Sequence, residues 1–121
     1  MIPVFDTNIL IDHLKGYVKA QEEIEKYTHS FISIMTWVEV MVGVKTEQMK
    51  KQAEKLLSNF EIINLTQDIA EEAVLLRQNY KMALPDAIIW ATAKVQNTLL
   101  VTRNVKDFPS GEPDIRIPYS I

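Results

Sequence analysis

The 121-residue sequence contains no cysteine and only three glycines. Without cysteine, the chain has neither a disulfide framework nor a thiolate metal site. No stretch approaches the roughly 18 consecutive apolar residues of a membrane-spanning helix. The N-terminal MIPVFDTN also lacks the basic region and apolar segment of a signal peptide. With no internal repeat or linker, these absences predict a single domain over residues 1–121, with a cytoplasmic location and no membrane association.

Positive charge is also scarce, since 13 Lys and Arg face 16 Asp and Glu and the net charge is −3. Tight non-specific binding of nucleic acid depends on Lys and Arg, so this balance weighs against it. A nuclease remains compatible with the sequence, because the acidic excess can lie in a metal site. The hydrophobic content of 47% is enough for a modest core.

Short apolar runs alternate with helical patterns along the chain. We expect strands at 2–5, 31–34, 62–65, 99–102 and 115–117, and helices at 8–14, 18–27, 37–44, 46–60, 66–80 and 85–96. The helix over 46–60 is predicted to be amphipathic, with Met49, Ala53, Leu56, Leu57 and Phe60 at helical spacing. This alternation predicts an α/β fold whose mostly parallel sheet is covered on both faces.

Four acidic residues lie where a strand is expected to end or a helix to begin: Asp6, Glu39, Asp86 and Asp107. In an open α/β sheet, ligands bind at the carboxyl ends of the strands, so the fold can gather these carboxylates at one edge. Such a cluster repels itself unless a divalent cation neutralises it. Ligands that are all oxygen favour Mg²⁺ or Mn²⁺.

Each acid also has a purely structural explanation. Asp6 can cap the helix that follows it, and Glu39 completes a capping box with Thr36. Asp86 lies in the first turn of its helix, where the helix dipole favours a negative charge, and Asp107 lies in an expected turn.

The joint pattern favours a functional site over four separate caps. Glu39 lies deep in apolar sequence, and no Lys, Arg or His occurs between residues 30 and 44. A carboxylate buried there needs a partner or a metal ion. Asp86 opens the segment AIIWATA, which is apolar nearly all round and therefore predicts a central helix.

The segments VFDTNILID, T-W-x-E at Thr36 to Glu39, LPDAIIWATA and LLVTRNVKDF together resemble the PIN-domain family, and within it the VapC-type toxins of toxin–antitoxin pairs. The resemblance covers essentially the whole chain. It implies a three-layer α/β/α sandwich and a metal-dependent endoribonuclease that hydrolyses RNA phosphodiester bonds.

By the same resemblance, Asp6, Glu39, Asp86 and Asp107 are the catalytic acids. Asp6, Asp86 and Asp107 are expected to hold Mg²⁺ or Mn²⁺, while Glu39 either ligates the metal or positions the attacking water. Some family members have an acid where this chain has Asn104; here Asp107 is the acidic candidate for the fourth position, and Asn104 is its neutral neighbour with an auxiliary role. The resemblance further implies a homodimer, inhibited by a cognate antitoxin that presents Arg or Lys to the acidic pocket.

Auxiliary roles are expected for a few neighbouring polar residues. Thr7 and Asn8 are candidates to bond Asp6 or metal-bound water, and Thr102 to orient an acid or a phosphate; capping or turn formation is the alternative for all three. The candidate phosphate contacts are Lys81, Arg103 and Lys106.

The remaining distinctive residues are assigned to structure. His13 and His29 are expected at the surface or in packing, and Trp37 and Trp90 in the core or at a dimer contact. The acids Glu22, Glu23 and Glu25, with Lys19 and Lys26, are expected to form a solvated helix face.

Two other functions remain open. A phosphoacceptor receiver domain has similar length and acidity, but it needs two adjacent acids after its first strand and a central Asp after its third. A PIN-like domain that only binds is the second alternative, although retention of four mutually repelling acids argues against it.

Overall fold

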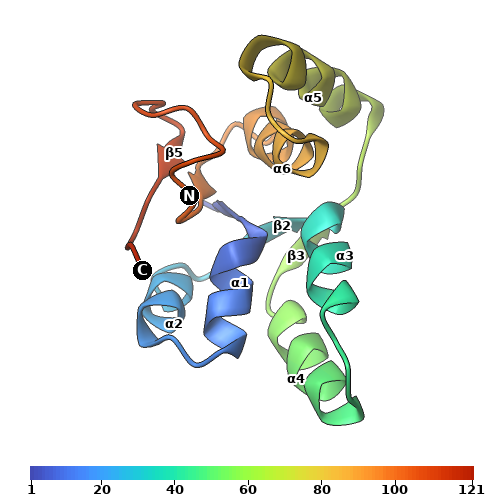
Figure 1. Ribbon diagram of the computed structural model, residues 1–121, viewed down its shortest axis with the longest axis vertical. Coiled ribbons are helices and arrows are strands. Elements are labelled where there is room, and N and C mark those ends of the chain that lie inside the picture. Colours follow the sequence, from blue (N-terminus) through green and yellow to red (C-terminus); the bar gives the residue numbers. More distant parts are fainter.

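The computed structural model describes residues 1–121, in which strands and helices alternate (Figure 1). The strands are β1 Val4–Phe5, β2 Phe31–Ser33, β3 Glu61–Ile63, β4 Leu100–Val101 and β5 Ile115–Arg116. The helices are α1 Thr7–Leu14, α2 Val18–Glu25, α3 Ile34–Val42, α4 Glu47–Leu57, α5 Gln67–Tyr80 and α6 Leu84–Val95. Every element predicted from the sequence is present. None of these helices is both long and apolar enough to cross a membrane.

The five strands form one sheet in the order β3-β2-β1-β4-β5, and every neighbouring pair is parallel. The chain runs outward from β1 through β2 to β3 and then returns past β1 to form β4 and β5. The direction of winding therefore reverses between β1 and β4. In doubly wound sheets, the crevice outside the carboxyl ends of two such strands is the usual place for a ligand.

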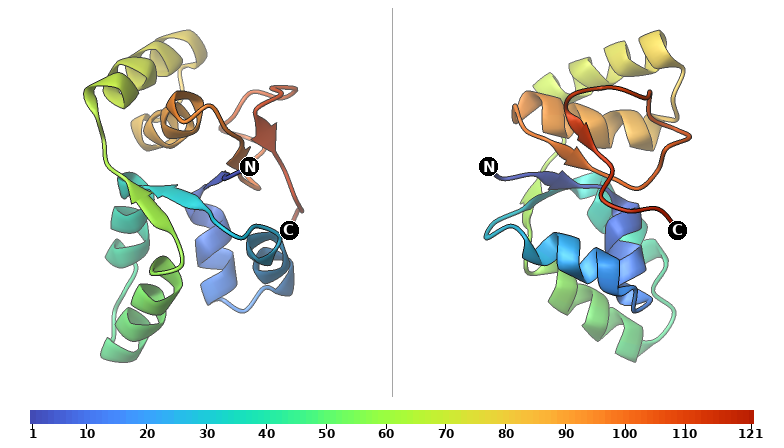
Figure 2. Two further views of the ribbon diagram at one scale, coloured as in Figure 1. Left: turned by 180° about the vertical axis from the view of Figure 1, so that it is seen from behind. Right: turned by 90° about the vertical axis from the view of Figure 1, so that its left-hand side faces the viewer.

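Helices cover both faces of the sheet, as Figures 1 and 2 show. Successive strand residues point to opposite faces, so a continuous apolar strand needs a helical layer on each side. Val4 and Leu100 pack in one core with α5 and α6, where Trp90 is fully buried. Phe5 and Val101, the next residue of each strand, pack in a second core with α1, α2 and α4. This arrangement confirms the predicted three-layer sandwich.

The start of α3 differs from the prediction. The helix begins at Ile34 rather than Trp37, because the Ser33 hydroxyl accepts a hydrogen bond from the backbone N–H of Met35 (3.0 Å) and caps it. The capping box between Thr36 and Glu39 is therefore wrong, since both residues lie inside the helix. The side chain of Glu39 is left available for other contacts.

The solvated helix face expected around Glu23 is also wrong at that residue. Glu23 is only 2% exposed, and its carboxylate accepts two hydrogen bonds from the Arg116 guanidinium (2.7 and 3.0 Å). Lys26 lies 3.1 Å from the same carboxylate. Because Arg116 belongs to β5, this ion pair fastens α2 to the edge of the sheet.

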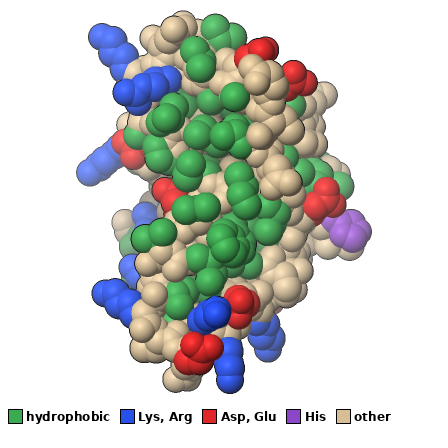
Figure 3. All heavy atoms as spheres, turned by 90° about the vertical axis from the view of Figure 1, so that its right-hand side faces the viewer, with side chains coloured by type: hydrophobic (Ala, Val, Ile, Leu, Met, Phe, Trp, Pro, Cys, Tyr) green, Lys and Arg blue, Asp and Glu red, His purple; other side chains and the backbone are tan.

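Hydrophobic side chains gather on the surface that carries α3, α4 and α5 (Figure 3). We call it the α3–α5 face and define it by Trp37, Val38, Val42, Val74 and Leu75, which are exposed by 38–79%. Trp37 is thus a surface residue, unlike Trp90. The predicted amphipathic helix α4 contributes little to this face, because Ala53, Leu56 and Leu57 are buried and only Met49 is exposed.

Candidate active site

An open pocket of about 460 Å³ lies where the carboxyl ends of the central strands meet α3 and α6. Three of the four predicted acids line it: Asp6 after β1, Glu39 on α3 and Asp86 on α6. The other lining residues are Thr7, Asn8, Ile11, Val38, Val42 and Asn104. No Lys, Arg or His is among them. The prediction that Asp6, Glu39 and Asp86 converge on one pocket is confirmed.

Asp6 is the most buried of these acids, at 3% exposed. It caps α1 by accepting a hydrogen bond from the backbone N–H of Thr7 (2.7 Å). Its other oxygen accepts hydrogen bonds from the Thr102 hydroxyl (2.8 Å) and the Asn8 amide (3.2 Å). Burial raises the pKa of Asp6 to about 6 against the lowering effect of the bonds from Thr102 and Thr7, and the charges of Asp86 and Glu39 raise it further. Asp6 therefore serves both as the cap of α1 and as part of the pocket.

Glu39 is held by a pair of threonines. The hydroxyl of Thr7 lies 2.6 Å from the Glu39 carboxylate and donates to it. The same hydroxyl lies 3.0 Å from that of Thr36, which is fully buried within α3. Because a hydroxyl donates only one proton, Thr36 donates to Thr7 and Thr7 to Glu39. This link fixes the carboxylate from the β1–α1 junction.

Asp86 is half-buried in the first turn of α6. Burial raises its pKa to about 6, and the charges of Asp107 and Glu39 add to the rise. Asp107 is exposed and does not line the pocket, but its charge acts on Asp86, which does. The Asn104 amide donates to the Asp107 carboxylate (2.7 Å), while Asn104 itself lines the pocket. The fourth acid, Asp107, is thus joined to its neutral neighbour Asn104.

The predicted phosphate contacts do not line the pocket. Lys81 and Lys106 are exposed outside it. The Arg103 guanidinium instead makes a two-point ion pair with Asp12 on α1. Asp12 was not singled out in the sequence, although it directly follows the apolar run Ile9–Ile11. The reasoning that flagged Glu39 applies to it equally, because a buried charge needs a partner.

The oxygen-rich lining fits a divalent cation in charge and in donor type. No three Asp, Glu or His side chains, however, form a cluster that could ligate a metal directly. In this arrangement Asp6, Asp86 and Asp107 do not form a set of three direct ligands. Like charges repel, and Thr102 and Thr7 hold Asp6 and Glu39 separately. Mg²⁺ usually keeps several waters and binds only one or two carboxylates, so the donor set still suits it.

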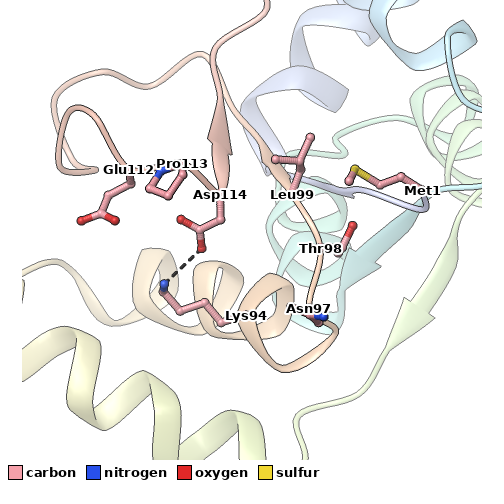
Figure 4. Close-up of a pocket in the computed structure, with 8 residues that line it drawn as sticks. All are labelled: Met1, Lys94, Asn97, Thr98, Leu99, Glu112, Pro113 and Asp114. Atoms are coloured by element: carbon pink, nitrogen blue, oxygen red, sulfur yellow. Dashed lines mark ion pairs between the residues drawn. The ribbon is translucent and has the colours of Figure 1, made fainter.

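A second pocket, of about 520 Å³, lies at the amino ends of the strands, between Met1, Leu99 and Asp114 (Figure 4). Its acid Asp114 is paired with Lys94 at 3.1 Å and accepts a hydrogen bond from the Trp90 indole (3.0 Å). This pocket lies at the opposite edge of the sheet and its acid is already neutralised. The acidic pocket at the carboxyl ends is therefore the candidate active site.

The fold and site together define a doubly wound α/β domain with a cation-attracting acidic pocket at the point where the winding reverses. The PIN domain family model matches residues 4–109, and the chain belongs to this family. Ribonucleases with a PIN domain generally depend on divalent metal ions.

Known relatives resemble the chain over nearly its whole length. Ribonuclease VapC10 of Mycobacterium tuberculosis is 31% identical over 96% of this chain and 92% of its own length. A toxin–antitoxin complex from Klebsiella pneumoniae contains a chain that is 49% identical, with a TM-score of 0.91 over 98% of this chain and 99% of that one. VapBC2 from Rickettsia felis, bound to a DNA fragment from its promoter, is 26% identical, with a TM-score of 0.71 over 88% and 90% of the two chains.

Proposed function

We propose that this chain is a divalent-metal-dependent endoribonuclease and the toxin of a VapBC-type toxin–antitoxin pair. The observation that carries the proposal is the convergence of Asp6, Glu39 and Asp86 on one pocket that no basic residue lines. The likeness of the chain to ribonuclease VapC10 supports RNA as the substrate, and its likeness to the chain in the Klebsiella toxin–antitoxin complex supports an antitoxin partner. We propose the cytoplasm as its location, since RNA is the substrate.

In the proposed site, Asp6, Asp86 and Asp107 would hold Mg²⁺ or Mn²⁺, directly or through water. When bound, such an ion lowers the pKa of a water molecule and neutralises negative charge on the phosphate. We assign these roles because the charges of Asp86 and Glu39 act on Asp6 and the charge of Asp107 acts on Asp86.

The other residues of the pocket keep the acids in place. Thr102 and Asn8 fix one oxygen of Asp6 by donating to it. Thr7 directs the Glu39 carboxylate, which we assign to orienting the attacking water.

A homodimer is the proposed assembly, and the α3–α5 face is its proposed interface. Val42 is 79% exposed on this face, and Val74 and Leu75 are each 52% exposed. Contiguous apolar surface of this kind marks a protein–protein contact more often than free surface. Because the face includes Val38 and Val42, which also line the pocket, it adjoins the active site.

The antitoxin would cover the acidic pocket with Arg or Lys. Charge-assisted hydrogen bonds to carboxylates are about twice as strong as neutral ones. A basic side chain in this pocket would neutralise the same carboxylates that a metal ion neutralises, and it would thereby exclude RNA. A small upstream reading frame with a DNA-binding N-terminus would support this pairing.

The two alternative functions are weaker. A receiver-type domain has the strand order 2-1-3-4-5, whereas this sheet has β3-β2-β1-β4-β5, so the receiver alternative is excluded. A PIN-like domain that only binds would have the same fold. Only an assay for RNA cleavage separates it from the enzyme.

The decisive experiment is cleavage of defined RNA by the purified chain with Mg²⁺ or Mn²⁺, with and without EDTA. We expect cleavage that EDTA abolishes and that Asp86→Asn lowers by at least about 100-fold, a usual loss when electrostatic stabilisation of a transition state is removed. Asp68→Asn is the matched control, because Asp68 occupies the first turn of α5 as Asp86 does in α6 but lies outside the pocket.

Two outcomes would contradict the proposal. Undiminished cleavage in EDTA would refute the metal-dependent mechanism. Absence of cleavage on every RNA tested with metal, by a folded chain freed of its partner, would favour the binding module.

A further inference from the structure

The chain contains two ion-pair clusters of nearly the same composition, and neither was predicted. In the first, Asp12 accepts two hydrogen bonds from the Arg103 guanidinium and one from the Tyr119 hydroxyl (2.8 Å). In the second, Glu23 accepts two from Arg116 and a longer one from Tyr27 (3.3 Å).

The clusters are also matched in exposure. The acids Asp12 and Glu23 are 1% and 2% exposed, and the side chains of Arg103 and Arg116 are 34% and 37% exposed. They differ in what surrounds each arginine in the chain. Arg103 lies between Thr102, which bonds Asp6, and Asn104, which lines the pocket.

The segment 102–107 is tied to α1 at two successive turns. The backbone N–H of Arg103 donates to the Asn8 side chain (3.3 Å) on the first turn, and its guanidinium binds Asp12 on the next. Thr102 is further held by Asp6, by Asn8 and by the backbone carbonyl of Arg116, whereas the hydrogen bonds from Asn104 onward are internal to the segment. The N–H groups of Asn104, Lys106 and Asp107 bond only to side chains of Thr102 and Asn104.

The third member of the cluster comes from the C-terminal segment. After β5 the chain runs back past α1 and α2 (Figure 2, right), and Tyr119 is buried there in the core of that face. Its hydroxyl shares the Asp12 oxygen that receives the Arg103 Nε–H. Tyr119 therefore holds Asp12 in the orientation that Arg103 requires.

We propose that Asp12, Arg103 and Tyr119 form a positioning clamp that sets where the segment 102–107 presents Thr102, Asn104 and Asp107 to the active site. None of the three clamp residues lines the pocket, so they act through the segment and not on substrate. The proposal deepens the ribonuclease function and rests on it for its catalytic consequence. It also makes the last residues of the chain part of the machinery that shapes the site.

A purely structural role is the competing explanation, and the second cluster allows a direct test of it. Arg103→Lys and Arg116→Lys each replace a two-point guanidinium contact by a single ammonium contact at similar burial. Arg116→Lys should lose less stability, because Lys26 still pairs with Glu23, so the two variants are compared at a matched loss of Tm. Only Arg103→Lys should loosen the segment 102–107.

The experiment compares the variants by amide hydrogen exchange of the segment 102–107, at millisecond labelling times, and by kcat for RNA cleavage. For Arg103→Lys we expect exchange to rise and kcat to fall by about tenfold each, the usual effect of losing one hydrogen bond to a charged group. For Arg116→Lys, at a matched loss of Tm, both quantities should stay within about twofold of the parent.

Tyr119→Phe against Tyr27→Phe is the second matched pair, and it decides the question if Arg103→Lys does not fold. Equal effects within both pairs, or unchanged exchange in Tyr119→Phe and Arg103→Lys, would overturn the clamp. The exchange measurement needs no RNA and no metal. If the parent protein fails to cleave RNA, the proposed function is refuted, but the exchange measurement still tests the clamp.

Discussion

Asp6→Asn tests how much the buried charge of Asp6 destabilises the folded protein. The Asn side chain keeps an oxygen for the backbone N–H of Thr7, so the cap on α1 survives. Its amide nitrogen replaces the oxygen that accepts hydrogen bonds from Thr102 and Asn8. The free-energy cost of these lost hydrogen bonds is the same at every pH. The free energy gained by removing the buried charge grows as the pH rises.

The size of the pH-dependent part follows from the pKa of Asp6. Burial raises this pKa from 3.8 to about 6. The folded metal-free protein therefore holds a proton that the unfolded chain has already released, and its stability falls as the pH rises through this window. At 1.36 kcal/mol for each pH unit, the loss between about pH 4 and pH 7.5 is about 2–3 kcal/mol. Asp6→Asn does not titrate and should escape it.

The assay is urea and thermal unfolding of metal-free protein at about pH 4 and about pH 7.5. Relative to the parent, Asp6→Asn should gain about 2–3 kcal/mol on going to the higher pH. Each kcal/mol corresponds to about 4 °C in Tm for a chain of this size. Asp68→Asn, on the exposed first turn of α5, is the control and should show no such gain. A stability difference between Asp6→Asn and the parent that does not change with pH would refute the reasoning.

Three further predictions concern other parts of the fold. Thr7→Val should lower kcat by about tenfold and also lower Tm, because Glu39 loses its 2.6 Å donor and buried Thr36 loses its acceptor; an unchanged kcat would contradict this role for Thr7. Val42→Asp should convert a dimer into a monomer in sedimentation velocity, since Val42 is the most exposed residue of the α3–α5 face; a parent protein that is already monomeric would rule out the interface. Glu23→Gln should lower the free energy of unfolding by about 2 kcal/mol, because Arg116 loses its charged partner; urea unfolding measures this, and a change below about 0.5 kcal/mol would show that the pair is solvated.

The sequence by itself determined which segments are strands and helices, because hydrophobic periodicity and capping are local properties. The apolar segment AIIWATA had to be a central helix, and α6 is buried along most of its length. The same local reasoning placed Asp6 and Asp86 at element boundaries, where parallel strands and their following helices present side chains to one edge. It was wrong at the start of α3, where Ser33 and Thr36 are both acceptable caps and only the packing of β2 decides between them.

Tertiary structure alone decided which charged residues pair with one another. Arg103 was expected to contact phosphate and Glu23 to face solvent, yet each is bound to a partner more than 90 residues away. Hydrophobic periodicity does not reveal such a partner, because the pairing depends on strand order. β4 lies beside β1 and β5 beside β4, which brings Arg103 to α1 and Arg116 to α2. The sheet order also placed Thr102 beside Asp6, although 96 residues separate them. The four acids were therefore visible in the sequence, while the contacts that hold them in position exist only once β1 and β4 are neighbours.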